Sequence, residues 1–381
     1  MRAIAVKEFR ELRRDRRTLA MLFLLPFLFL VVFGYAASFD VKDVPTVVVG
    51  TGAETVAAAL PATFDVVATE ADGDRTGAEE LLRSGEAVVA VVTPAAGDGR
   101  ATVLIDGTEL FAAQAALRSL AELQASHASG AAAGGQSPLG GASNPSVQVS
   151  VLFNPALRTA VIMIPGLCGV ILVFVGTVAT ALGVVRERQN GTMEQLAVMP
   201  FRPRDVFLGK IAPYLLIAAA DMVIVVVAGM LLFDVPFRGS VATFALGAIL
   251  FLFVTLGTGV LISSVSQTQG QAIQLAMMTM LPQFLLSGLF FPLYSMPWGV
   301  RWIGYLLPLT WFIKVARGVM VRGAPIGALW LPLVILAVMA VVVFTASTLR
   351  FRRDLAPAGG PEERGHGADA VADAGSAEAT R

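Results

Sequence analysis

The stretch VIMIPGLCGVILVFVGTVATALGVV occupies residues 161–185 and contains no charged side chain. About 20 apolar residues are enough for a helix to cross a bilayer, so this stretch predicts a transmembrane helix. The whole chain has a similar character: of its 381 residues, 56% are hydrophobic and 15% are charged. Soluble domains carry about 25% charged residues. The composition therefore excludes a purely soluble protein and a disordered one.

The polar composition argues against several classes of site. The formal net charge is zero, so no overall field favours nucleic acid as a partner. Cys168 is the single cysteine, which excludes an intrachain disulfide and a cysteine zinc site. The two histidines, His127 and His366, lie far apart in polar segments. We therefore expect no histidine metal cluster and no histidine-based catalytic triad.

The hydropathy pattern predicts an α-helical polytopic membrane protein with six transmembrane helices. They are expected at residues 18–38, 158–185, 211–233, 241–263, 272–293 and 326–349. Lysine and arginine gather in three places: residues 1–17, the loop at 186–210 and the start of the tail at 350–381. By the positive-inside rule these segments are cytoplasmic. We therefore expect a multi-pass protein of the cell membrane with both termini in the cytoplasm.

Two segments complicate this topology. Residues 294–325 carry Arg301, Lys314, Arg317 and Arg322 but must face outward, because no apolar run is left to supply another crossing. All four tryptophans lie in this segment or near its end, which is typical of helices at a membrane interface. Residues 18–38 end in small side chains, and cleavage as a signal peptide is an alternative to a first span.

Residues 39–157 form the only long polar region, and their excess of acidic residues favours an extracytoplasmic location. Apolar runs and helical patterns alternate there, which predicts a small α/β domain between spans one and two. Strands are expected at residues 45–50, 64–69, 87–93 and 101–106. Helices are expected at 54–60, 77–84 and from Thr108, as a cap, to about Ser129. Residues 130–146 predict a flexible linker.

The loop at 186–210 is predicted to present a short helix parallel to the membrane. Gly191 interrupts the preceding helix, Thr192 can cap a new one over residues 193–198, and Pro200 ends it. A membrane protein that is moved by a cytoplasmic motor needs such a rigid contact. A simple capped turn between two spans is the alternative. Residues 1–17 predict an amphipathic interfacial helix, and residues 350–381 a disordered tail.

Three motifs in this order resemble a known family. The loop RERQNGTMEQLAVMPFRPRDVFLGK (186–210) resembles the coupling-helix region of type-2 ABC export permeases. FNPALRTAVIMIPGL (153–167) resembles the Asn-Pro motif that precedes their second span. Residues 263–319, which include LPQFLLSGLFFPLYSMPWG, resemble their carboxyl-terminal signature. The domain after the first span is similar to that of the multidrug-type branch of the family.

The resemblance implies a permease that works as a dimer, with a second copy or a paralogue, and that binds cytoplasmic ABC ATPase subunits. It implies a re-entrant helical hairpin at residues 294–325. It also implies that the loop docks on the ATPase, with the coupling residues Glu187, Arg188, Gly191, Thr192, Glu194, Leu196 and Pro200. The chain has no GxxxxGK[ST] phosphate loop, so ATP and Mg²⁺ are expected on the partner, and this chain is predicted not to be an enzyme.

The apolar spans suggest a hydrophobic or amphipathic cargo, drug-like or lipid-like, together with contacts to membrane lipid. Asp221 falls near the middle of the third span, where a charge is costly and marks a cavity or a partner. With Met277 and Met280 it forms the predicted transport path. A protonated Asp221 bonded to a neighbouring helix is the structural alternative. Two other functions remain open: an ion-coupled transporter that uses Asp221, and a membrane anchor for the α/β domain.

Overall fold

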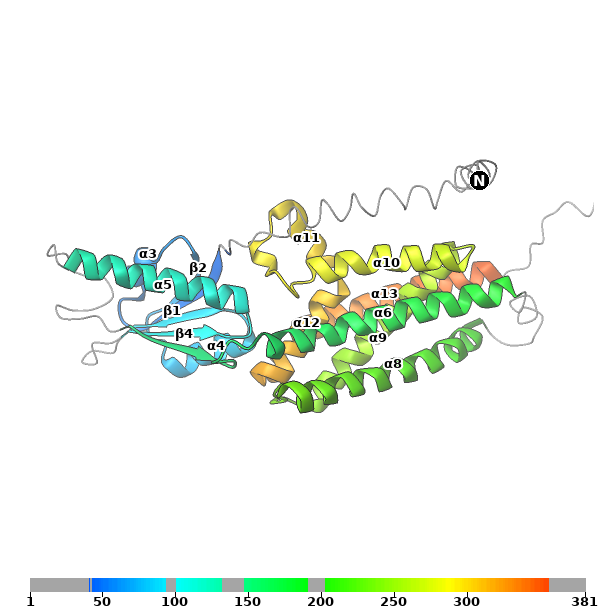
Figure 1. The fold of residues 1–381 in the computed structure, drawn as a ribbon, viewed down its shortest axis with the longest axis horizontal. Helices are drawn as coiled ribbons and strands as arrows, with labels where there is room; N and C mark the ends of the chain where they lie inside the picture. Colours follow the sequence, from blue (N-terminus) through cyan, green and yellow to red (C-terminus); the bar gives the residue numbers. More distant parts are fainter. Residues whose placement is uncertain (1–40, 42, 94–100, 132–146, 191–202, 356–381) are drawn as a thin grey trace, which may run out of the picture.

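The computed structural model describes residue 41 and residues 43–93, 101–131, 147–190 and 203–355. The predicted interfacial helix and first span lie outside these residues, as do most of the predicted linker and residues 191–202 of the coupling loop. Of the predicted disordered tail, residues 350–355 continue the last helix, and the rest lies outside the described residues. The described part has two regions, an α/β domain and a bundle of long helices, arranged end to end along the long axis (Figure 1).

The α/β domain is built on a five-stranded sheet with the strand order β2-β1-β3-β4-β5. Its strands are β1 (Val44–Val49), β2 (Phe64–Glu70), β3 (Val89–Val92), β4 (Thr102–Asp106) and β5 (Gln148–Leu152). Only the β3–β4 pair is antiparallel. The helices are α3 (Ala53–Ala59), α4 (Arg75–Ser84) and α5 (Leu110–Ala131). These elements confirm the predicted α/β fold.

Both faces of this sheet are covered, because apolar side chains of a strand point alternately to its two faces. Val89 and Val91 of β3 pack with α3 and α5 on one side. Ala90 of β3 and Leu104 of β4 pack with α4 on the other. Figure 1 shows α3 and α5 on the opposite side of the sheet from α4. The domain thus has three layers and two apolar cores.

The predicted strands and helices of this domain agree with the structure to within two residues at each end. One strand was missed. β5 lies directly after the predicted linker and pairs parallel with β4, from Thr102 opposite Gln148 to Asp106 opposite Leu152. It also brings the chain back to the bundle, because α6 begins seven residues later, at Thr159.

The bundle contains five long helices: α6 (Thr159–Gln189), α8 (Pro203–Phe233), α9 (Val241–Val265), α10 (Gln269–Leu286) and α13 (Trp330–Leu355). Four described segments are long and apolar enough to cross a membrane: Thr159–Gln189, Ala212–Phe233, Val241–Val265 and Trp330–Arg350. α10 is not among them, although the sequence predicts a fifth span at 272–293. It is shorter than predicted, because it ends at Leu286 and the chain turns at Gly288, whose φ is 83°.

The predicted re-entrant segment is a bent pair of helices. A short 3-10 turn, η1 (Leu293–Ser295), precedes α11 (Trp298–Leu306). After Leu307 come α12 (Pro308–Arg317) and a π-helical turn, η2 (Gly318–Arg322). The axis bends by 76° between the two parts, as in a broken span or a re-entrant loop. The described residues therefore supply four spans, or five if this pair counts as one, and the prediction of six is not established.

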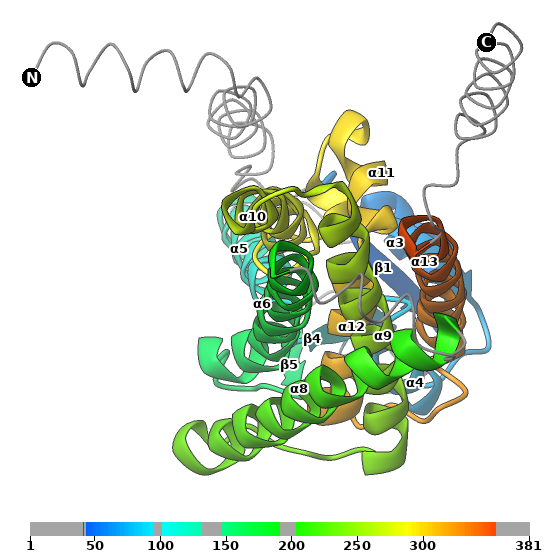
Figure 2. The ribbon, with the colours of Figure 1, turned by 90° about the vertical axis from the view of Figure 1, so that its right-hand side faces the viewer.

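α6 and α9 form the centre of the bundle (Figure 2). Their backbones approach closely at small residues, since a Cβ atom on Gly259 would lie 2.7 Å from the carbonyl oxygen of Thr177. In the most apolar 18-residue stretch of α6 and of α9, 61% of the residues are buried, compared with 17% in α8. α8 therefore turns most of its apolar surface outward, to lipid or to another protein.

Candidate functional site

The end of the bundle that leads into the predicted coupling loop is held by polar bonds. Nη1 of Arg188, in the last turn of α6, donates to the carbonyl oxygens of Ser263 and Ser266, at 3.1 Å each. Nε2 of Gln269 donates to Oε1 of Gln189 at 2.9 Å. The carboxyl end of α6 is thereby tied to the end of α9 and the start of α10.

The structure describes only two of the predicted coupling residues. Glu187 and Arg188 lie in the last turn of α6. The others lie outside the described residues, and their docking role stays a prediction: Gly191, Thr192, Glu194, Leu196 and Pro200.

The three residues of the predicted transport path lie apart. Asp221 is on α8, and one of its carboxylate oxygens is buried with no hydrogen-bond partner among the described residues. Met277 and Met280 are on α10; Met277 is exposed and Met280 packs against the main core of the bundle. None of the three lines either of the two large cavities described next.

An apolar cavity of about 610 Å³ lies between α9, α10, α11 and α13. The hydroxyls of Thr258 and Thr279 in its wall donate to carbonyls of their own helices. The remaining polar group is the amide of Gln283, whose buried Oε1 has no partner in the described part of the chain. Further lining residues are Val254, Leu275, Met278, Pro282, Ile303, Leu306, Leu307, Pro308, Met339 and Val343. Cavities of this size, with apolar walls and few polar groups, are typical of small-molecule sites.

The sequence contains a signal for this cavity that the predicted transport path did not use. The lining residues of α10 are Leu275, Met278, Thr279, Pro282 and Gln283. Their spacing of three and four residues is that of one face of a helix. The predicted Met277 and Met280 belong to other faces, so Met278 is the methionine at the cavity.

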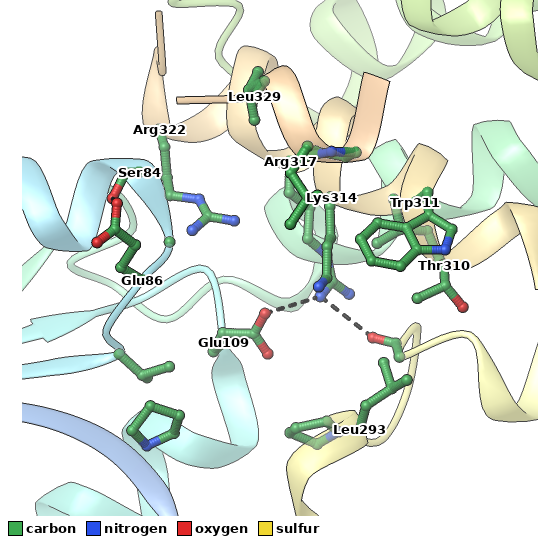
Figure 3. A pocket seen from close by; sticks show the side chains of 18 of the residues that line it. Ser84, Glu86, Glu109, Leu293, Thr310, Trp311, Lys314, Arg317, Arg322 and Leu329 are labelled. Carbon is green, nitrogen blue, oxygen red and sulfur yellow. Dashed lines mark hydrogen bonds and ion pairs between the residues drawn. The ribbon is translucent and has the colours of Figure 1, made fainter. Parts of the chain in front are cut away.

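A second cavity, of about 400 Å³, lies where the α/β domain meets α12 and η2 (Figure 3). The domain contributes the ends of α4 and β4, and the bundle contributes α12, η2 and the start of α13. Arg317 and Arg322 point into this region and are only 4% and 9% exposed. The sequence predicts that these two arginines lie in an outward-facing segment near the membrane interface; it does not predict that the α/β domain covers them, as it does in the structure.

Each of the two arginines faces an acid of the α/β domain. Arg317 donates to the carbonyl oxygens of Gly288 (3.4 Å) and Leu289 (2.9 Å), and its Nη1 lies 3.6 Å from Oε1 of Glu109. Nη1 of Arg322 lies 3.6 Å from Oδ2 of Asp106. A π-helix closes its bonds over five residues, which brings Arg322 above Arg317, five positions earlier. The π turn thus aligns both guanidinium groups with the domain.

Asp106 is held in place by the turn that follows β4. The backbone N–H and the hydroxyl of Thr108 donate to its two carboxylate oxygens, at 2.8 and 2.9 Å. Burial raises the pKa of Asp106 above its ordinary value, and the attraction of Arg322 opposes this rise without cancelling it. Thr108, which the sequence predicts as a helix cap, therefore orients an acid of this second cavity, which we call the charged cavity. α5 itself begins at Leu110.

Aromatic rings complete one wall of the charged cavity. The ammonium of Lys314 lies 4.7 Å from the ring centre of Trp311 and 5.6 Å from that of Tyr305. Such distances are typical of cation–π contacts. The cavity therefore combines three cations with aromatic and aliphatic surface.

The Asn-Pro motif connects the two regions of the molecule. The side-chain amide of Asn154 donates to the carbonyls of Gly107 and Arg158, and its Oδ1 accepts from the N–H of Arg158. Asn154 is buried. It fixes the turn after β4, which carries the acids of the charged cavity, onto the start of α6.

A sequence profile described as "ABC-2 family transporter protein" matches residues 16–349, most of the chain. The chain belongs to the ABC-2 family. This ABC-2 protein is 32% identical over 176 residues to the probable multidrug ABC transporter permease YbhR of Escherichia coli (strain K12), covering 46% of this chain and 48% of that one. It is 32% identical over 187 residues to the inner membrane transport permease YhhJ of the same organism, covering 48% and 50%.

A more distant relative is the ABC transporter G family member 20 of Dictyostelium discoideum, with 26% identity over 170 residues, which cover 44% of this chain and 23% of that one. The chain spans about half the length of the bacterial relatives that it matches. The family match and the apolar helices together show that this ABC-2 protein is a multi-pass membrane permease. They confirm the resemblance and leave the side of the α/β domain a prediction.

Proposed function

We propose that this chain is the membrane-spanning subunit of an ATP-driven exporter of a hydrophobic or amphipathic compound, drug-like or lipid-like. The observation that supports this function most strongly is the cavity of about 610 Å³ between α9, α10, α11 and α13. Its walls are apolar, and Oε1 of Gln283, which has no partner among the described residues, can accept a hydrogen bond from a polar group on the cargo. Family membership adds support, since two relatives are named probable multidrug ABC transporter permeases.

ATP is bound and hydrolysed, with Mg²⁺, by separate ABC ATPase subunits, and a second permease copy or paralogue completes the complex. The motor contacts the loop after α6, with both termini and this loop on the cytoplasmic side, and the α/β domain lies outside. The bonds of Arg188 and Gln189 support this arrangement, because they link α6 to α9 and α10. A force on the loop would reach two helices that line the apolar cavity.

Blocking the apolar cavity tests the proposal. Met278→Trp places a larger side chain in the cavity wall, and we expect ATP-dependent efflux of a fluorescent amphipathic dye to fall at least about tenfold. Met277→Trp is the matched control, because this neighbouring methionine is exposed and does not line the cavity. Efflux should remain near the wild-type rate in the control. Equal efflux in both variants, at equal membrane levels, would show that cargo does not pass through this cavity.

Asp221 supports a second candidate function, an ion-coupled transporter. Its buried carboxylate oxygen has no hydrogen-bond partner among the described residues, and ionisable residues inside apolar spans mark proton or ion pathways. Asp221→Asn keeps the size and removes the titration. This candidate predicts that the variant loses transport driven by a proton gradient. Full transport by the variant, with ATP as the only energy source, would exclude it.

A further inference from the structure

The charged cavity between the α/β domain and α12 holds a group of donors without acceptors. Four lining residues have a buried polar side-chain atom with no hydrogen-bond partner in the described part of the chain: Ser287 Oγ, Tyr294 Oη, Arg317 Nε and Arg322 Nε. Each of these atoms carries a hydrogen and can donate it. Buried donors are costly when they lack an acceptor, so this cavity suits a ligand that brings several acceptor oxygens.

The charges of the cavity set the charge of that ligand. Of the charged side chains that line the cavity, Arg317, Arg322 and Asp106 are buried, Glu109 is partly exposed, and Lys314 and Glu86 are exposed. The buried part of the site therefore carries one uncompensated positive charge. A ligand group with several oxygens and a single negative charge, such as a phosphodiester, matches it.

The place of the cavity in the molecule identifies the source of such a group. α13, an apolar segment able to span a membrane, begins at Trp330, and Trp330, Leu331 and Pro332 line the cavity. Trp298 and Trp302 of the neighbouring α11 are exposed. Exposed tryptophans at the end of an apolar helix mark the level of lipid head groups. The cavity therefore lies at the depth where phospholipid phosphates are found.

We propose that the charged cavity binds the phosphodiester of a phospholipid with one net negative charge. Arg322 and Arg317 (Figure 3) donate to the phosphate oxygens, and so do the hydroxyls of Tyr294 and Ser287. The glycerol and acyl chains lie along the apolar wall formed by Leu293, Trp311 and Leu329. Glu86 lies exposed at the rim on the domain side, where it disfavours a second negative charge. This inference rests on the membrane location of the chain and does not depend on its cargo.

Lipid retention by the full-length chain tests the site. The chain is purified in detergent, stripped of lipid and mixed with phosphatidylglycerol or phosphatidylcholine, and retained lipid is counted by native mass spectrometry. We expect one molecule of phosphatidylglycerol, bound about tenfold more tightly than phosphatidylcholine. Arg322→Gln should weaken this binding about tenfold, because a charged hydrogen bond is lost. Arg75→Gln, on the exposed side of α4, should leave it unchanged.

A second variant guards against misfolding of Arg322→Gln. Tyr294→Phe keeps the ring and removes only the unpartnered hydroxyl, so the fold should persist and phosphatidylglycerol binding should weaken severalfold. Inorganic phosphate distinguishes a lipid from a soluble anion, and we expect millimolar phosphate neither to raise the thermal midpoint nor to displace the lipid. Equal retention of both lipids, displacement by inorganic phosphate, or unchanged binding in both Tyr294→Phe and a folded Arg322→Gln would each overturn the proposal.

Discussion

The two cavities of this molecule differ in how their polar groups are used. The charged cavity, of about 400 Å³, is assembled from two regions that are distant in sequence, and ion pairs hold those regions together. The apolar cavity, of about 610 Å³, lies within the helices, and the buried Oε1 of Gln283 in its wall bonds to none of the described residues. Removing a polar group should therefore weaken the protein at the first cavity and strengthen it at the second.

The largest expected effect follows from Arg317→Met. This change removes the bonds to Gly288 and Leu289 and leaves Glu109 without its partner. We expect the free energy of unfolding to fall by about 3 kcal/mol, as for one half of a buried ion pair. Arg301→Met on α11, where the side chain is only partly buried, should change it by less than about 0.5 kcal/mol. Thermal melts in detergent measure the stability of both variants. Equal losses of stability would mean that the buried contacts of Arg317 contribute no more than the partly buried side chain of Arg301.

A smaller loss is expected for Gly85→Ala. Gly85 ends α4 with a φ of 81°, and a Cβ atom there would press on the guanidinium of Arg322. The left-handed backbone alone costs about 1–2 kcal/mol for a residue with a side chain. Gly299→Ala is the control, because its Cβ would meet nothing within 4 Å. If the thermal midpoint of Gly85→Ala equalled that of the wild type, α4 would not lie as closely against Arg322 as described.

The apolar cavity should respond with the opposite sign. Gln283→Leu removes a buried amide whose Oε1 is unpartnered, and we expect a gain of about 1 kcal/mol in the free energy of unfolding. Gln271→Leu, on the same helix, should lose about 1 kcal/mol, because Oε1 of Gln271 accepts from the N–H of Gln267 at 3.0 Å. If both variants lose stability, Oε1 of Gln283 has a hydrogen-bond partner after all, and the two cavities do not differ in this respect.

The smallest effect is the dependence on pH of the charged cavity. Burial raises the pKa of Asp106 above its ordinary value of 3.8, so the folded chain binds this proton more tightly than the unfolded chain does. The resulting stability is complete below that value and is lost as pH rises through the folded pKa. The thermal midpoint of the wild type minus that of Asp106→Asn should therefore fall from about pH 4 to about pH 8. A difference that rises with pH would mean that Arg322 outweighs burial.

Local patterns were sufficient to predict the long helices and most of the α/β domain. Alternation of apolar residues predicted β1 to β4, and long uncharged runs predicted α6, α8, α9 and α13. β5 was missed because five residues with a weak pattern become a strand only through pairing with β4. α10 was predicted to continue beyond Leu286, since composition does not show the turn at Gly288.

The sites were harder to predict than the fold. The basic residues of α12 looked out of place in the sequence, and this was a real signal, but the partners of Arg317 and Arg322 lie about 200 residues earlier, in Glu109 and Asp106. Hydropathy says nothing about contacts over such a distance. At the apolar cavity the choice among three methionines depended on the rotation of α10, which the positions of Thr279 and Gln283 indicate.

Transport by reconstituted vesicles tests the central claim most directly, namely that a separate ATPase drives this permease. The chain is placed in vesicles with and without the ATPase subunits that purify with it, and uptake of an amphipathic dye into inside-out vesicles is measured with ATP and Mg²⁺ or with a proton gradient. We predict uptake only when the chain, the ATPase and ATP are present together. Uphill uptake by the chain alone, driven by the proton gradient, would contradict the claim.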